Sequence, residues 1–204
     1  MCTRVIADIR NKYGTIQSTD SQSIQKAVEL LLSQVGLSSP AEPLPVVKLL
    51  QELGFTLYRA TFKDRYQSGL IAVDSSLPEK NPVFKTDRAV LVNQEDSTAH
   101  QRFTIAHEIA HYIFDFDEST QPVYYKAYNT KEQEDEAELR ANRFAAELLM
   151  PTSAFVDAFD KIKKEQGEIF SLSTTITKLA NQFDVPATAV QRRIQETGCN
   201  KLMN

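Results

Sequence analysis

Residues 104–114 read TIAHEIAHYIF, an apolar stretch interrupted by two histidines and one glutamate. On an α-helix, His107 and His111 differ by about 40° in azimuth and about 6 Å in rise, so both imidazoles lean toward one point. That placement suits two ligands of one tetrahedral metal ion, and Glu108 is near enough to take a proton from a metal-bound water. The HExxH spacing therefore predicts a metal centre on a helix over residues 98–114.

The residues around the motif predict that this helix is buried. Apolar side chains recur at helical spacing on two of its sides: Phe103, Ala106, Ala110 and Phe114 on one, and Ile105, Ile109 and Ile113 on the other. Polar groups inside a core need compensation, which a metal ion supplies. The alternative is a pair of hydrogen-bonded core histidines, and this alternative leaves Glu108 unexplained.

A catalytic zinc ion takes three protein ligands and keeps one position open for water. His100, the one histidine outside the motif, lies about 10 Å from His107 along the same helix, too far to join the same metal ion. The two cysteines, Cys2 and Cys199, lie near opposite ends of the chain. We therefore expect the third ligand to be a carboxylate.

The predicted helix over residues 131–149 offers several carboxylates. Of these, Glu138 heads an inward-facing stripe that continues with Ala141, Asn142, Ala145, Leu148 and Leu149. Glu138 is accordingly the predicted third ligand. Glu147 is the second choice, behind Glu138, since it shares a face with Arg140 and Arg143 and is predicted to be exposed, not inward-facing. The acidic run at 132–136 is interpreted as a solvated face, with steering of a basic substrate as the alternative.

The remaining pattern predicts an α+β fold that is mostly helical, with a small three- to four-stranded sheet packed on the HExxH helix. Strands are predicted at 55–60, 69–74 and 88–93, with a further edge piece at 82–84. Further helices are predicted at 21–35, 46–53, from 153 onward, at 173–183 and at 187–197. We divide the chain into an N-terminal helical extension (1–40), a core (41–170) and a C-terminal helical pair packed on the core (171–204).

Composition limits the classes of function. The chain has 204 residues, with 23 Lys and Arg against 27 Asp and Glu, and its net charge of −4 argues against a protein that mainly grips nucleic acid. No apolar run of about 18 residues predicts a membrane span, and no secretory signal is recognisable. Two cysteines are too few for a disulfide framework, so we expect a cytoplasmic protein.

Residues 101–111 and 138–151 together resemble the ImmA/IrrE family of metallopeptidases, which are zincin-like proteins of bacteria and mobile elements. The resemblance runs from about residue 45 to residue 198 and has no counterpart for residues 1–40. It implies a zincin-like core with one Zn²⁺ per chain, or another divalent ion, held by His107, His111 and Glu138, with Glu108 as general base. It also implies that the substrate is a helix-turn-helix transcriptional repressor encoded nearby.

The expected function is that of a zinc-dependent endopeptidase. Glu108 would deprotonate the zinc-bound water, which attacks the scissile carbonyl group while zinc polarises that carbonyl oxygen. Tyr112, Tyr124 and Tyr125 are candidate donors to the oxyanion, with a packing role as the alternative for each. The segment 115–130 is expected to form the lip of the cleft.

Two other functions compete with this one. The helices at 173–183 and 187–197 have the apolar pattern and short connection of a helix-turn-helix motif. Such a motif would make the chain a metal-binding transcriptional regulator or a DNA-binding module without proteolysis. Lys178, Arg192 and Arg193 are weak support for phosphate contacts in an acidic chain, so direct DNA binding is not expected. A purely structural zinc module is disfavoured, because such sites have four closed ligands rich in cysteine.

Overall fold

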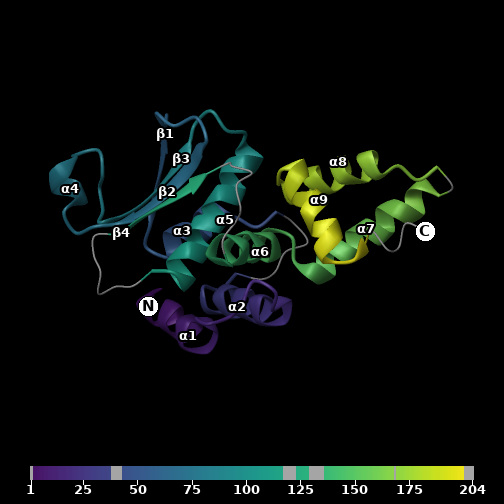
Figure 1. Ribbon diagram of the computed structural model, residues 1–204, viewed down its shortest axis with the longest axis horizontal. Helices are drawn as coiled ribbons and strands as arrows, with labels where there is room; N and C mark the ends of the chain where they lie inside the picture. Colours follow the sequence, from purple (N-terminus) through teal and green to yellow (C-terminus); the bar gives the residue numbers. More distant parts are fainter. Residues whose placement is uncertain (1, 38–42, 117–122, 129–135, 168, 200–204) are drawn as a thin grey trace.

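The HExxH stretch forms α5 (Thr98–Phe114), the central helix of the computed structural model (Figure 1). The structure describes residues 2–37, 43–116, 123–128, 136–167 and 169–199. The other helices are α1 (Cys2–Tyr13), α2 (Ser21–Gln34), α3 (Val46–Glu52), α4 (Leu77–Lys80), α6 (Glu136–Leu149), α7 (Thr152–Gln166), α8 (Leu172–Phe183) and α9 (Ala187–Glu196). The strands are β1 (Thr56–Ala60), β2 (Gln67–Val73), β3 (Arg88–Asn93) and β4 (Val123–Tyr128).

The described strands form one sheet in the order β1-β3-β2-β4. β1 pairs with β3 in parallel, whereas β2 is antiparallel to both β3 and β4. The predicted α+β class with a small sheet is confirmed. The predicted edge piece at 82–84 was wrong: Pro82 has no N–H to donate, and the Val83 N–H is turned back to the Asn81 side chain at 3.1 Å. The fourth strand is β4, which lies within the segment 115–130 that is predicted to form the lip of the cleft.

α5 begins where the sequence predicted it. The Ser97 side chain accepts a hydrogen bond from the His100 backbone N–H, which satisfies one of the free donors of the first turn. From Thr104 to Ile113 every residue of the helix is buried. α5 packs against β2 on one side and α6 on another, so it lies inside the molecule.

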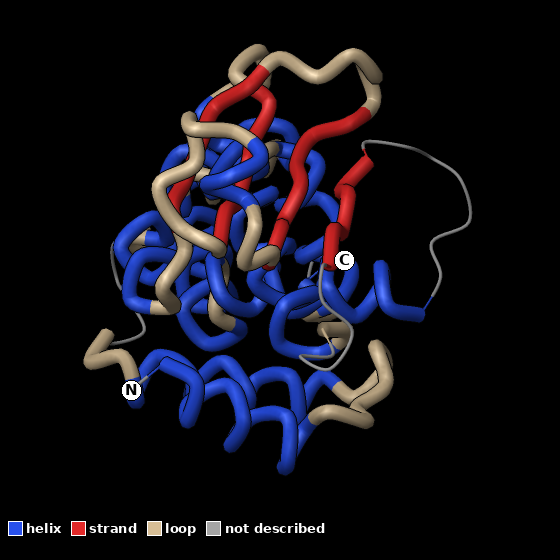
Figure 2. The backbone as a smooth tube through the Cα atoms, turned by 90° about the vertical axis from the view of Figure 1, so that its left-hand side faces the viewer, coloured by secondary structure: helices blue, strands red, loops and turns tan. Residues whose placement is uncertain are grey.

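The elements are layered around this helix. In Figures 1 and 2 the sheet lies in the upper part of the view and the pair α1–α2 at the bottom. α7, α8 and α9 lie together beside α6 in Figure 1. One continuous apolar core contains buried residues from Val5 in α1 to Cys199 beyond α9. Among the described residues, no helix combines the length and hydropathy that crossing a bilayer requires.

Candidate metal centre

Two helices bring three potential ligands together. α5 contributes Nε2 of His107 and Nε2 of His111, which lie 2.9 Å apart. α6 contributes Glu138, whose Oε2 lies 3.2 Å from His107 Nε2 and whose Oε1 lies 3.2 Å from His111 Nε2. The structure therefore assembles the His-His-Glu set that the sequence predicted as ligands.

The spacing of these atoms fits a tetrahedral metal ion. Ligand atoms about 2.0–2.1 Å from a tetrahedral centre lie about 3.3 Å from one another. The two Nε2 atoms lie 2.9 Å apart, and each of them lies 3.2 Å from a different oxygen of the Glu138 carboxylate. Two imidazole nitrogens and one carboxylate form a donor set that suits zinc and related divalent ions, and it leaves the fourth position of the tetrahedron open.

The second nitrogen of each imidazole is held by a neighbouring side chain. His107 Nδ1 lies 3.1 Å from Oδ1 of Asn142, which is one turn after Glu138 on α6. His111 Nδ1 lies 2.8 Å from Oδ2 of Asp115, the residue that ends α5. Both acceptors favour an N–H at Nδ1, so the lone pair of each neutral ring lies at Nε2, on the side of the cluster.

The electrostatics of the cluster favour a positive charge between the histidines. Burial opposes protonation of His111, but its hydrogen bonds with Asp115 and Glu138 outweigh burial and raise its pKa to about 10. Burial also opposes ionisation of Glu138, yet the hydrogen bonds from both histidines hold the pKa of this carboxyl well below its usual range. A divalent cation at this point would meet the same ionised carboxylate.

Glu108 lies fully buried at the contact between α5 and β2. A Cβ atom at Gly69 of β2 would lie 3.2 Å from Glu108 Oε1 and 2.4 Å from Thr104 Cγ2. The missing side chain at Gly69 therefore lets the helix approach the strand where the carboxylate lies. The charge of Glu108 also contributes to raising the pKa of His111.

The structure does not bring Tyr112 to the cluster. Its buried ring packs against Phe55 with centroids 4.8 Å apart, and its hydroxyl accepts a hydrogen bond of 2.6 Å from Arg88. Tyr112 is therefore a core residue, and an oxyanion role for it is not supported. Tyr124 and Tyr125 pair with Ala72 and Ile71 through the β4 backbone, and their side chains lie outside the described part of the structure.

The excluded His100 and the second-choice ligand Glu147 also lie elsewhere. His100 Nε2 lies 3.2 Å from Ser68 Oγ on β2, in keeping with its exclusion. Glu147 was predicted to be exposed, and that was wrong: it is 5% exposed and forms an ion pair with Arg193 of α9. Its carboxylate also accepts hydrogen bonds from the backbone N–H and the hydroxyl of Thr152. Glu147 joins the C-terminal helices to the core and is remote from the cluster.

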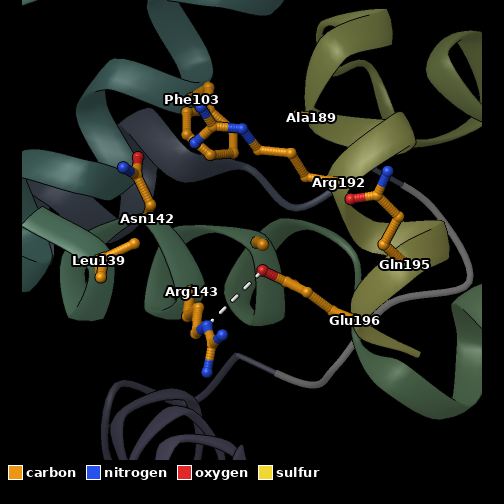
Figure 3. Close-up of a pocket in the computed structure, with 9 residues that line it drawn as sticks. Phe103, Leu139, Asn142, Arg143, Ala189, Arg192, Gln195 and Glu196 are labelled. Atoms are coloured by element: carbon orange, nitrogen blue, oxygen red, sulfur yellow. Dashed lines mark ion pairs between the residues drawn. The ribbon is translucent and has the colours of Figure 1, made fainter. Parts of the chain in front are cut away.

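A cavity of about 370 Å³ lies between α5, α6 and α9 (Figure 3). Asn142 lines this cavity and also bonds His107, so the cavity and the candidate centre share a wall. Across the cavity, Arg143 Nε and Glu196 Oε1 lie 3.8 Å apart. The other lining residues are Phe103, Leu139, Ala146, Ala189, Arg192 and Gln195.

The sequence analysis missed the roles of Asp115 and Gly69. Asp115 follows His111 by four residues, the spacing at which helical side chains meet, and that signal was readable. Gly69 lies inside β2 between Ser68 and Leu70, and a glycine within a strand is a sign of close backbone approach. Asn142 is predicted from the sequence to face inward, but its hydrogen bond with His107 is visible only in the structure.

Comparisons with known proteins bear on the region that carries these residues. A peptidase family model described as the IrrE N-terminal-like domain matches residues 51–195. Among solved structures, a Mycobacterium tuberculosis transcriptional regulator is similar at 15% identity and a TM-score of 0.48, over 95% of this chain and 51% of that one. The chain thus spans about half the length of that regulator. No protein among the curated sequences matches.

Proposed function

We propose a function for this chain from one premise: it belongs to the IrrE N-terminal-like family of peptidases. That membership indicates a metallopeptidase-type domain, and we propose specifically a zinc-dependent endopeptidase that hydrolyses a peptide bond in a protein. The observation that carries the proposal is the convergence of His107, His111 and Glu138 with Glu108 buried beside them.

Each residue has a distinct part in this proposal. His107, His111 and Glu138 would hold the ion, which when bound supplies a Lewis acid that lowers the pKa of water and polarises a carbonyl oxygen. The Glu108 carboxylate would accept the proton of the attacking water and pass it to the departing amine. Asn142 and Asp115 would keep the imidazole rings in orientation.

The cavity beside the centre supports a polypeptide substrate. It is bounded by three helices, and Asn142 both lines it and bonds His107. A side chain next to the scissile bond could occupy it while the carbonyl group reaches the centre. We propose a helix-turn-helix repressor encoded nearby as that substrate, in the cytoplasm, so that cleavage would release silenced genes.

Of the three cations that could contact phosphate in the DNA-binding alternative, Arg193 is buried. Arg193 is 6% exposed and donates to the Met150 carbonyl at 3.0 Å as well as to Glu147. Lys178 lies 3.7 Å from Glu165, a surface pairing of little energetic weight. A buried guanidinium cannot contact phosphate, which favours packing as the purpose of α8 and α9.

The decisive experiment compares wild-type protein with Glu108→Gln at equal zinc content. Each would be co-expressed with the neighbouring repressor, and new protein N-termini in the cells would be mapped by chemical labelling. We expect wild type to cleave the repressor and Glu108→Gln to cleave it about 10²–10⁴-fold more slowly, because general-base catalysis is lost.

Glu79→Gln is the matched control, since Glu79 is exposed on α4 and should leave the rate unchanged. Equal rates for wild type and Glu108→Gln, or cleavage that persists with chelator present, would refute the proposed mechanism. New termini in other proteins, with an intact repressor, would retain the endopeptidase and reject the substrate.

A further inference from the structure

The N-terminal segment, residues 2–37, lies outside the region matched by the family yet contacts both helices of the candidate centre. α1 packs on α5, and α2 packs on α6. The connection between α1 and α2 contains Ile16 and Ser18, both buried. Three sets of hydrogen bonds tie this segment to the metal-bearing helices.

The first set of hydrogen bonds is made with the last turn of α5. Arg10 of α1 donates from Nε to the Ile113 carbonyl at 2.9 Å and from its terminal nitrogen to the Tyr112 carbonyl. Carbonyl groups in the last turn of a helix lack intrahelical partners, and a cation there interacts favourably with the helix dipole. Arg10 thereby fixes the turn that follows His111.

The second set reaches a ligand through two side chains. Arg140 Nη1 donates to the Ile16 carbonyl at 3.2 Å, and its Nη2 donates to Oδ1 of Asp115. The other oxygen of Asp115 lies 2.8 Å from His111 Nδ1. One planar guanidinium therefore spans the N-terminal segment and the carboxylate that orients a ligand.

The third set holds the start of α6, two residues before Glu138. The Ser18 backbone N–H and hydroxyl both donate to the Glu136 carboxylate, the hydroxyl at 2.9 Å. The Ser18 carbonyl accepts from Arg143. The contacts with Glu136 hold the first turn of α6, which supplies the third ligand, whereas the contact of Arg143 lies farther along the helix.

From these contacts we infer that Arg140 is a positioning residue of the metal centre and that the α1–α2 connection holds it in place. The inference rests on the proposed metal site but not on peptide hydrolysis. It makes metal affinity depend on residues that the family match does not contain. An N-terminal segment that only adds apolar core would stabilise the fold without this dependence.

Arg140→Gln and Arg143→Gln form a matched pair for the test. Both arginines lie on α6 and donate to a backbone carbonyl of the α1–α2 connection, but only Arg140 contacts Asp115. In competition with a chromophoric chelator, Arg140→Gln should weaken Zn²⁺ binding about 10-fold, because partners outside the ligand shell typically change affinity by 10–100-fold. Arg143→Gln should change it less than about 3-fold on the same scale, and the thermal stability of both chelator-treated proteins reports any general loss of fold.

Hydrogen exchange tests the same coupling through a second, independent measurement. Because coupling between two sites is reciprocal, Zn²⁺ should slow amide exchange in residues 14–20, and Arg140→Gln should abolish that effect. Equal zinc affinity in Arg140→Gln and wild type, or exchange at 14–20 that is indifferent to zinc, would overturn the inference. Neither measurement uses a substrate, so a protein without peptidase activity could still show the coupling.

Discussion

At the residue scale, Glu138 and Glu147 show how two glutamates of one helix serve different purposes. Glu138 faces α5 and contacts both histidines, whereas Glu147 lies under α9 against Arg193. The sequence pattern correctly predicted that Glu138 faces α5. It did not predict that Glu147 is buried, because Glu147 is covered by α9, more than 40 residues further along the chain.

Glutamine substitutions should separate these two roles. Glu138→Gln should weaken Zn²⁺ binding by more than about 100-fold, since a ligand matters at least as much as its supporting partners. Glu147→Gln should lower the free energy of unfolding by about 3 kcal/mol, because the Arg193 charge stays buried without its counter-charge. Chelator competition and urea unfolding measure the two effects, and a loss of zinc binding in Glu147→Gln would contradict the assignment.

The pKa of His111 predicts how metal binding depends on pH. A metal ion binds the neutral imidazole, and Asp115 and Glu138 raise the pKa of His111 to about 10 despite its burial. Zinc must then displace a proton at every pH below that value, so affinity should keep rising with pH well above 6.5. Asp115→Asn should bring the plateau to lower pH. An affinity that levels off near pH 7 in wild type would show that His111 is neutral there.

At the element scale, the contact of α5 with β2 sets the depth at which Glu108 lies. Gly69→Ala would place a methyl group 2.4 Å from Thr104 Cγ2, too close for the helix to stay in place. We expect a loss of about 1–3 kcal/mol in stability, as for other overpacked cores. Peptidase activity should fall with it as Glu108 shifts.

Thr104→Ser removes the obstructing methyl group and provides the control. The double variant Gly69→Ala/Thr104→Ser should recover much of the stability lost in Gly69→Ala, although the Leu91 carbonyl at 3.3 Å still crowds the new methyl group. Urea unfolding of the four proteins measures the interaction between the two positions. If the two substitutions change the free energy of unfolding additively, the methyl group of Gly69→Ala does not contact the Thr104 methyl group.

The elements that the sequence predicted well are those with strong local signals. The bounds of α5 follow from the Ser97 cap and ten consecutive buried positions, and β3 was predicted at its observed residues. α1 and β4 were missed: β4 gains its identity from pairing with β2, more than 50 residues earlier. The contacts of Arg140 with Ile16 and Asp115 are likewise tertiary, so spacing along the chain could not reveal them.

At the scale of the whole molecule, one apolar core and the Glu147–Arg193 pair connect all three predicted segments. We therefore expect a single unfolding transition. Zinc at 100 times its dissociation constant adds about 2.7 kcal/mol to the native state. For a chain of this length that raises Tm by about 5–10 °C.

Calorimetry with zinc and with chelator measures this shift, and Glu138→Gln should show almost none of it. A separate transition for α8–α9 would contradict the single core. It would instead support independent folding of the C-terminal pair.

The contacts of Ser18 also order the events of biosynthesis. Glu136 and Arg143 follow it by 118 and 125 residues. At a ribosomal rate of about 5–20 residues per second, the α1–α2 hairpin waits roughly 6–25 s for its docking surface to be made. During that interval the apolar side of the α1–α2 hairpin is a natural target for chaperones at the exit tunnel. The contacts of Ser18 with α6 cannot form before most of the polypeptide has been translated.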